Sequence, residues 1–189
     1  MALNGKTIFY SDEKEFTKFI KSATIHLETN YPKFYKMDNL SKLAFFAADI
    51  VLKENIIHSK ENENIAIILS NKSSSLDTDR KHQISISDKE NYYPSPSIFV
   101  YTLPNICMGE ISIKHQLHSE NTFFIFEKFN ANHLYINADF LLKNKKADKV
   151  LCGWSDFDDN NYEAFLYLVS ENGNIAHLPG EIERLYQNK

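Results

Sequence analysis

The apolar spacing i, i+3, i+4, i+7 recurs twice in the first third of the chain. It predicts one amphipathic helix that begins after Ser11 and ends before Pro32, and a second helix that Asp38 caps. The apolar positions are Phe16, Phe19, Ile20 and Ala23 in the first helix, and Leu40, Leu43, Ala44, Ala47 and Val51 in the second. Each helix should therefore present one apolar face to a core.

Short apolar runs of strand length lie around these helices and beyond them. The predicted strands are Lys6–Tyr10, Ile65–Leu69, Phe123–Phe126, Val150–Cys152 and Phe165–Val169, and helices are predicted at 104–118 and 131–144. The continuous run at 65–69 is typical of a strand that is buried on both faces of a parallel sheet. Polar segments at 62–64, 70–79 and 89–97 are predicted to be turns or loops.

The order of these elements predicts the fold class. From 64 to 155 the order is strand–helix–strand–helix–strand, which implies a parallel sheet with helices on its faces. The polar turn 156–161 is too short for a helical crossover, so the last two strands should be antiparallel neighbours. We therefore expect a single α/β domain over residues 1–189, with a mostly parallel five-stranded sheet and an antiparallel last strand.

Composition narrows the classes of partner. A net charge of -4 gives the chain no general attraction to nucleic acid or to an anionic membrane. The first residues lack the apolar core of a signal peptide, and no apolar run approaches the length of a membrane span. Two cysteines are too few for a secreted disulfide scaffold. We expect a cytoplasmic protein that binds neither nucleic acid nor membrane.

Most residues with possible chemistry have an ordinary structural interpretation. His115 and His118 stand at i, i+3, but no acidic partner at a matching spacing completes a zinc site. Cys107 and Cys152 lie in apolar segments and are expected to be core residues rather than reactive thiols. The five glycines form neither a P-loop nor a dinucleotide fingerprint, so no cofactor is expected.

The segment after the fourth predicted strand imitates the start of a calcium loop. Asp156, Asp158 and Asn160 have the ligand spacing of such a loop. However, Asn161 occupies the position that needs glycine, and Tyr167 occupies the position that needs a bidentate glutamate. We therefore expect no metal here.

The turn Glu127-Lys128-Phe129 is the strongest local oddity. The apolar strand before it must end there, and a helix begins within about three residues. Such a turn presents its side chains at the carboxyl edge of a parallel sheet, where α/β proteins usually bind ligands. On its residue type alone, Lys128 reads as an ordinary surface lysine.

Several segments between Tyr31 and about Val169 together carry a resemblance to a known family. They are Tyr31-Pro-Lys-Phe-Tyr-Lys-Met-Asp38 with the helix that follows, Tyr101-Thr-Leu-Pro-Asn105 with Gly109-Glu-Ile-Ser-Ile113, Ala147-Asp148, and Gly153-Trp-Ser-Asp156. As a collinear set they resemble the N-terminal half of the β-ketoacyl synthases, the condensing enzymes of the thiolase fold. Within that family the chain looks most similar to short synthase-like proteins of aryl-polyene and flexirubin-type pathways, which are often labelled 3-oxoacyl-ACP synthase.

The resemblance implies that the chain does not catalyse condensation alone. Residues 119–157 align with a typical synthase without a gap, and the catalytic cysteine then falls on Lys128. A primary amine would form a stable amide if it were acylated, whereas the reaction needs a thiolate that can leave again. The family's two active-site histidines come from its C-terminal half, and neither His133 nor His177 lies in a matching motif. The inactive chain-length factors of the family usually carry glutamine at the nucleophile position and keep both halves. The details of their function, including a share in setting product length, are therefore not implied for this chain.

The resemblance also implies partners. In the family the nucleophile strand pairs across the dimer axis, which makes Asn121, Thr122, Phe123, Phe124, Ile125 and Phe126 candidates for a subunit interface. We expect a homodimer, or a heterodimer with a full-length ketoacyl synthase, in fatty-acid or polyene biosynthesis. A second hypothesis is a module that binds acyl-carrier protein through Lys143, Lys145 and Lys146, because carrier proteins are acidic. A third is an enzyme with Lys128 as amine nucleophile, although Glu127 would keep that amine charged if the side chains met.

Overall fold

The computed structural model of the chain describes residues 1–55, 64–90 and 92–188. Its strands are β1 (Ala2–Leu3), β2 (Lys6–Thr7), β3 (Ile65–Asn71), β4 (Asn121–Ile125), β5 (Lys149–Asp158) and β6 (Asn161–Ser170). Its helices are α1 (Phe16–His26), the 3-10 helix η1 (Pro32–Lys36), α2 (Asn39–Asn55), α3 (Leu76–Ser87), α4 (Pro96–Val100), α5 (Ile106–His115), α6 (Ala131–Lys143) and α7 (Pro179–Gln187). Within the described ranges, no helix is both long enough and apolar enough to cross a membrane.

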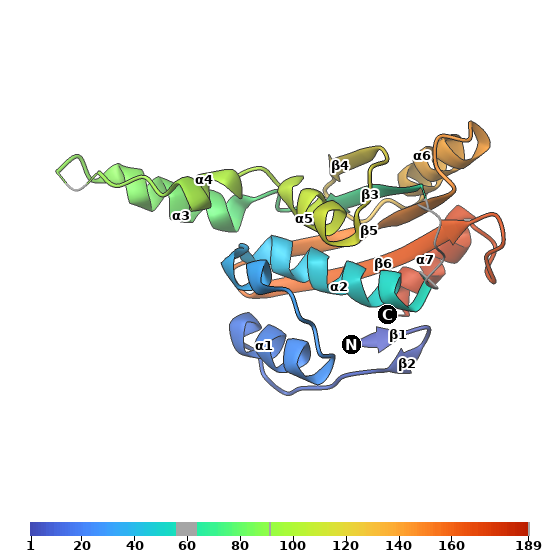
Figure 1. Ribbon diagram of the computed structural model, residues 1–189, viewed down its shortest axis with the longest axis horizontal. Helices are drawn as coiled ribbons and strands as arrows, with labels where there is room; N and C mark the ends of the chain where they lie inside the picture. Colours follow the sequence, from blue (N-terminus) through green and yellow to red (C-terminus); the bar gives the residue numbers. More distant parts are fainter. Residues whose placement is uncertain (56–63, 91, 189) are drawn as a thin grey trace.

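A four-stranded sheet in the order β4-β3-β5-β6 forms the middle of the molecule (Figure 1). β4 and β5 both run parallel to β3, so that Ile67 is level with Asn121 on one side and with Leu151 on the other. β6 runs antiparallel to β5 along all ten of its residues. The predicted parallel sheet with an antiparallel last strand is therefore confirmed.

The central strand β3 is buried along its whole length because helices cover both of its faces. Ile65, Ile67 and Leu69 pack into a core formed with α1, α2 and α5, whereas Ala66 and Ile68 pack into a second core formed with α6 and α7. Side chains alternate between the two faces of a strand, so one continuous apolar run serves two cores.

The two helices α2 and α5 meet at a buried carboxylate. Asp49 is 1% exposed, and its carboxylate lies 2.7 Å from Lys53 Nζ and 3.3 Å from His115 Nε2. Burial alone would raise the pKa of Asp49, but the contacts with His115 and Lys53 outweigh burial and lower it. His118 lies beyond the end of α5, so the two histidines of the suspected zinc spacing do not share that helix.

The predicted strand Lys6–Tyr10 is not part of the main sheet, which has four strands rather than five. Of this run only Lys6–Thr7 forms a strand, and it pairs with Ala2–Leu3 in a separate hairpin. Asn4 and Gly5 both have positive φ, +50° and +76°, as a tight two-residue hairpin turn requires. The Asn-Gly pair is a hairpin signal that outweighs the β propensity of the following run.

Other boundaries also differ from the sequence-based expectations. The segment 70–79 was expected to be a loop but contains the start of α3, a polar helix with Asp77 and Asp79 in its first turn. The segment 89–97 contains the start of α4 at Pro96, and residue 91 lies outside the described residues, as do residues 62 and 63 of the expected turn at 62–64. The turn expected at 156–161 shortens to Asp159 and Asn160, both with positive φ. Together α3 and α4 project from the body of the molecule as an arm (Figure 1).

Candidate functional site

The turn that follows β4 lies at the carboxyl edge of the sheet. β4 ends at Ile125 and α6 begins at Ala131, so five residues make the connection. Asn130 caps α6, because its side-chain oxygen accepts a hydrogen bond of 3.0 Å from the His133 backbone N–H. Glu127 and Lys128 are exposed, and within the described residues neither side chain forms a hydrogen bond or ion pair.

Phe129 anchors this turn to the core. Its ring is 8% exposed and stacks on Tyr186 of α7 with ring centroids 4.1 Å apart. Trp154 of β5 and Phe165 of β6 meet the same ring edge-on at 6.2 and 5.7 Å. Three adjacent residues thus divide their roles, because Phe129 fixes the turn while Glu127 and Lys128 remain available to solvent.

An open cleft of about 540 Å³ lies at the turn. Its walls are residues 126–132 on one side and Pro179 and Glu183 of α7 on the other. The volume is in the range of small-ligand sites. The turn was predicted from the sequence, but α7 was not. This helix lines the other side of the cleft, about fifty residues further along the chain.

Lys128 lacks the surroundings of a nucleophilic lysine. Lysines that act as nucleophiles are desolvated or lie near other cations. Lys128 is instead exposed to water, and the carboxylates of Glu127 and Glu183 line the same cleft. His133 is also no partner for Lys128, since its ring packs edge-on between Phe124 at 4.4 Å and Phe126 at 4.9 Å.

β4 presents an open backbone edge. The Ile67 N–H donates to the Glu120 carbonyl at 3.1 Å, and the Phe126 N–H donates to the Asn71 carbonyl at 2.9 Å. Backbone groups alternate in direction along a strand, so the even-numbered residues of β4 face β3. The N–H and C=O groups of Asn121, Phe123 and Ile125 therefore point outward, and no strand of the described residues pairs with them.

The side chains of β4 are only partly covered. Asn121, Thr122 and Ile125 are exposed, and Ile125 keeps 55% of its surface in contact with solvent. Phe123 packs partly against the core under α5, while Phe124 and Phe126 pack partly against the core under α6. An exposed apolar edge strand is, in general, a surface on which another chain can pair.

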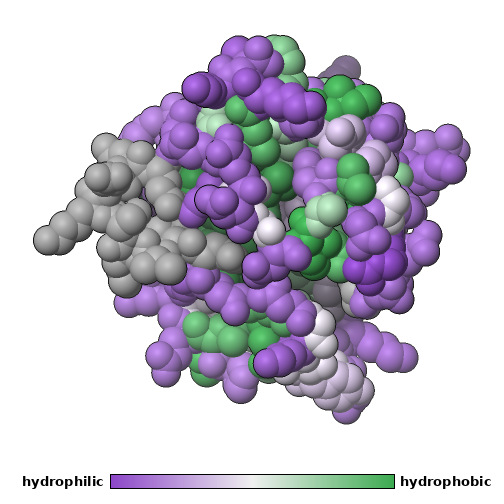
Figure 2. Space-filling view, turned by 90° about the vertical axis from the view of Figure 1, so that its right-hand side faces the viewer, coloured by the Kyte–Doolittle hydropathy of each residue, from purple (hydrophilic) through white to green (hydrophobic). Residues whose placement is uncertain are grey.

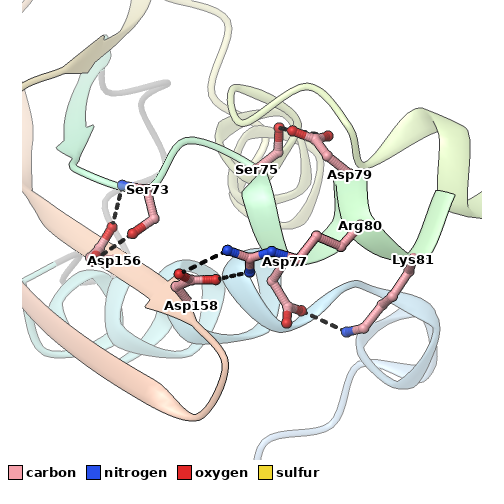
Figure 3. Close-up of polar contacts among 8 residues, drawn as sticks. All are labelled: Ser73, Ser75, Asp77, Asp79, Arg80, Lys81, Asp156 and Asp158. Carbon is pink, nitrogen blue, oxygen red and sulfur yellow. Dashed lines mark hydrogen bonds and ion pairs between the residues drawn. The ribbon is translucent and has the colours of Figure 1, made fainter. Parts of the chain in front are cut away.

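The neighbouring turn after β3 is closed by hydrogen bonds (Figure 3). The Asp156 carboxylate accepts bonds from the backbone N–H groups of Lys72 and Ser73, at 3.1 and 2.8 Å, and from the Ser73 hydroxyl at 3.2 Å. Asp158, two residues along the same strand, pairs with Arg80 of α3. These carboxylates belong to a strand and bind groups of the protein itself, so the resemblance to a calcium loop does not extend to the structure.

The two cysteines are core residues, as the sequence predicted. Cys107 and Cys152 are both fully buried and free. Burial raises the pKa of each thiol, which disfavours the reactive thiolate.

The three candidate lysines for a carrier protein lie where α6 ends. Lys143 pairs with Asp139 at 2.9 Å and Lys146 with Glu120 at 2.8 Å, whereas Lys145 stands in a left-handed position with φ +54°. Figure 2 faces the end of the molecule opposite the arm and shows mostly hydrophilic residues there, with separate apolar patches between them.

No family model and no curated protein matches the sequence. Solved structures do match. "The ishigamide ketosynthase/chain length factor" is 19% identical with a TM-score of 0.61, and the match covers 72% of this chain and 44% of that one. A structure titled "Ketosynthase (ApeO) in Complex with its Chain Length Factor (ApeC)", from Xenorhabdus doucetiae, is 13% identical with a TM-score of 0.61, and the match covers 84% of this chain and 74% of that one.

A third structure holds a type II PKS acyl-carrier protein in complex with its ketosynthase bound to the hexaketide. It is 15% identical with a TM-score of 0.57, and the match covers 70% of this chain and 39% of that one. The present chain thus spans less than half of two matched chains and three quarters of the other. The fold is that of ketosynthases and chain length factors, which confirms the predicted thiolase-type half fold.

Proposed function

We propose that this chain is a non-catalytic ketosynthase-like subunit that associates with a complete ketosynthase through β4. The observation that carries the proposal is the open, partly apolar edge of β4, which runs directly into the turn where the sequence resemblance puts Lys128 in place of the family's nucleophile. The edge offers a surface for assembly, and the turn offers no thiolate for condensation.

The solved structures support this proposal by analogy. The second of them is a complex of a ketosynthase with its chain length factor. The match covers 84% of the present chain and 74% of the matched chain, so the matched chain is only slightly longer. A chain of about this length can therefore be part of such a complex. Fatty-acid or aryl-polyene synthesis is the pathway class that the resemblance suggests.

The projecting arm extends the proposed interface. Ile84, Tyr92, Tyr93 and Phe99 on α3, α4 and their connection are each more than half exposed. An exposed apolar patch of this kind on a soluble chain marks an interaction site. The arm and β4 lie on the same side of the molecule, away from α1 and the β1–β2 hairpin (Figure 1).

Co-expression with the complete ketosynthase of the same organism tests the proposal. We expect the two chains to co-purify and to elute as one complex in size-exclusion chromatography with light scattering. The pathway assignment follows if the complex, but not this chain alone, extends acyl chains. A chain that stays monomeric at micromolar concentration and never recovers the ketosynthase would contradict the proposal.

Two exposed tyrosines provide a matched comparison. Tyr93 on the arm is 79% exposed and Tyr10 near α1 is 75% exposed. Tyr93→Ser should weaken the complex, because it removes an aromatic contact from the proposed interface, whereas Tyr10→Ser should leave it unchanged. Equal recovery of the ketosynthase by both variants would remove the arm from the interface.

A carrier-protein-binding module is the second candidate function. Within the described residues Lys145 has no ion pair, and one of the matched structures includes an acyl-carrier protein. Titration of acyl-carrier protein onto the isolated chain should then give a salt-dependent signal that Lys145→Gln reduces. A flat titration would eliminate this function and leave the subunit proposal standing.

A further inference from the structure

A second, smaller cleft lies between η1, α2 and α3, apart from the Lys128 turn. Its volume is about 220 Å³. Lysines from three separate elements line it, namely Lys36 of η1, Lys42 of α2 and Lys81 of α3. No sequence motif pointed to it, because the three lysines are spread over 46 positions and one of them follows the undescribed segment 56–63.

The position of the Lys42 ammonium destabilises the folded state. It lies in the first turns of α2, where the partial positive charge of the helix N-terminus disfavours a cation. It is half-buried, and within the described residues its ammonium forms no hydrogen bond or ion pair. Burial lowers the pKa of Lys42, the Asp38 carboxylate opposes that shift, and the Lys81 ammonium adds to it.

The anionic groups of the protein near the cleft are already engaged. Asp38 accepts a hydrogen bond of 2.9 Å from the Ser41 N–H and one of 2.8 Å from the Thr78 hydroxyl, one on each carboxylate oxygen. Asp77 pairs with Lys81 at 2.6 Å. These carboxylates leave Lys36 and Lys42 without an ion-pair partner among the described residues, so the cleft keeps a positive surplus.

We propose that this cleft binds the phosphate group of a small phosphate ester. A phosphate dianion can accept hydrogen bonds from several directions, and lysines of three elements that line one cleft can supply such donors as point charges. The volume is below that of a drug-sized ligand site, so it holds an anionic group and a few attached atoms. Met37, Ile98 and the ring of Tyr101 provide an apolar wall for those atoms.

Thermal unfolding of the isolated chain in inorganic phosphate, against chloride at equal ionic strength, tests the proposal. At 20 mM phosphate we expect the midpoint to rise by about 2–4 °C, as binding to the folded state alone predicts for a dissociation constant of about 5 mM. Lys42→Gln should abolish that rise while leaving the midpoint in chloride unchanged or higher, because an unfavourable buried charge is removed. Lys145→Gln, a lysine far from the cleft, should keep the full rise.

The same assay separates two sources of the phosphate group. Glycerol phosphate represents a free phosphate ester, and 4′-phosphopantetheine represents the arm of a carrier protein. Equal affinities would assign recognition to the phosphate alone, and at least tenfold tighter binding of phosphopantetheine would assign it to the arm. The absence of any phosphate effect beyond chloride, or an unchanged effect in Lys42→Gln, would overturn the site. Because no ketosynthase is present, this outcome is independent of the proposed subunit function.

Discussion

The two edges of the sheet differ in how well their side chains are covered. β6 has ten residues, of which only Asn161 is exposed. On one face Tyr162 packs against Phe16 and Phe19 of α1, and on the other Phe165 packs against Tyr186 of α7. β4 has five residues, and three of them are exposed. The side chains of one edge strand, β6, are thus mostly covered within the chain, whereas those of β4 are only partly covered, and within the described residues neither edge pairs with a further strand.

The largest effect is expected from a change that separates β6 from β5. A Cβ on Gly153 would lie 2.3 Å from the Phe165 carbonyl oxygen and 2.9 Å from Leu166 Cα, and both atoms belong to backbone. Gly153→Ala should therefore lower the free energy of unfolding by about 3 kcal/mol or more, measured by urea denaturation.

Gly109 provides the matched control for that substitution. It lies inside α5, and an added Cβ would meet nothing within 4 Å. Gly109→Ala should stabilise the chain by about 0.5–1 kcal/mol, because alanine is the better helix former. If both alanines changed the free energy of unfolding equally, the close approach of β5 and β6 would not be what stabilises this edge.

Removal of the buried carboxylate between α2 and α5 should come next in size. Asp49→Asn should cost about 2–3 kcal/mol at pH 7, because it removes a buried carboxylate that pairs with Lys53 and contacts His115, whereas Asp139→Asn at an exposed pair should cost about 0.5 kcal/mol.

The same aspartate gives the chain a defined response to acid. The pKa of Asp49 is lower in the folded than in the unfolded state. Its contribution to stability is therefore full above the unfolded pKa of about 3.9 and is lost as the pH falls through the folded pKa. Urea titrations at pH 7 and pH 3 should show a smaller loss for Asp49→Asn than for the wild type. An equal loss would mean that this ion pair does not contribute.

The smallest changes in stability are expected at the two turns at the carboxyl edge. Asp156→Ala leaves two backbone N–H groups and one hydroxyl without their acceptor, so we expect a loss of about 2 kcal/mol. Lys128→Ala should change stability by less than about 0.5 kcal/mol, because its exposed side chain has no described partner. A large cost for Lys128→Ala would show that the open turn is structural rather than available for binding.

Local patterns predicted the parts of the fold that depend on apolar periodicity. The stripe from Leu40 to Val51 identified α2, and the continuous run at 65–69 identified β3, because each segment packs on a large apolar surface. The helix α3 escaped prediction because it projects into solvent and needs no apolar face. The two-residue hairpin depended on Asn4 and Gly5 rather than on the propensity of the following residues.

The candidate site was predictable only in part, for a physical reason. The strand-to-helix turn at Lys128 could be located from local signals, because a strand that ends beside a helix start is visible in the sequence. The cleft could not, since α7 reaches Phe129 through a tertiary contact between Tyr186 and that ring. Pro179 followed by Glu181 was the available signal for a helix start.

Co-purification of Ile125 variants with the complete ketosynthase probes assembly through the edge of β4. Ile125→Pro removes an outward N–H of β4 without removing a bond to β3, whereas Ile125→Thr keeps that N–H and a β-branched side chain. If β4 pairs with the ketosynthase, Ile125→Thr recovers that protein as the wild type does, and folded Ile125→Pro recovers at most about a tenth as much. Recovery of the ketosynthase by Ile125→Pro at the wild-type level would contradict assembly through the edge of β4.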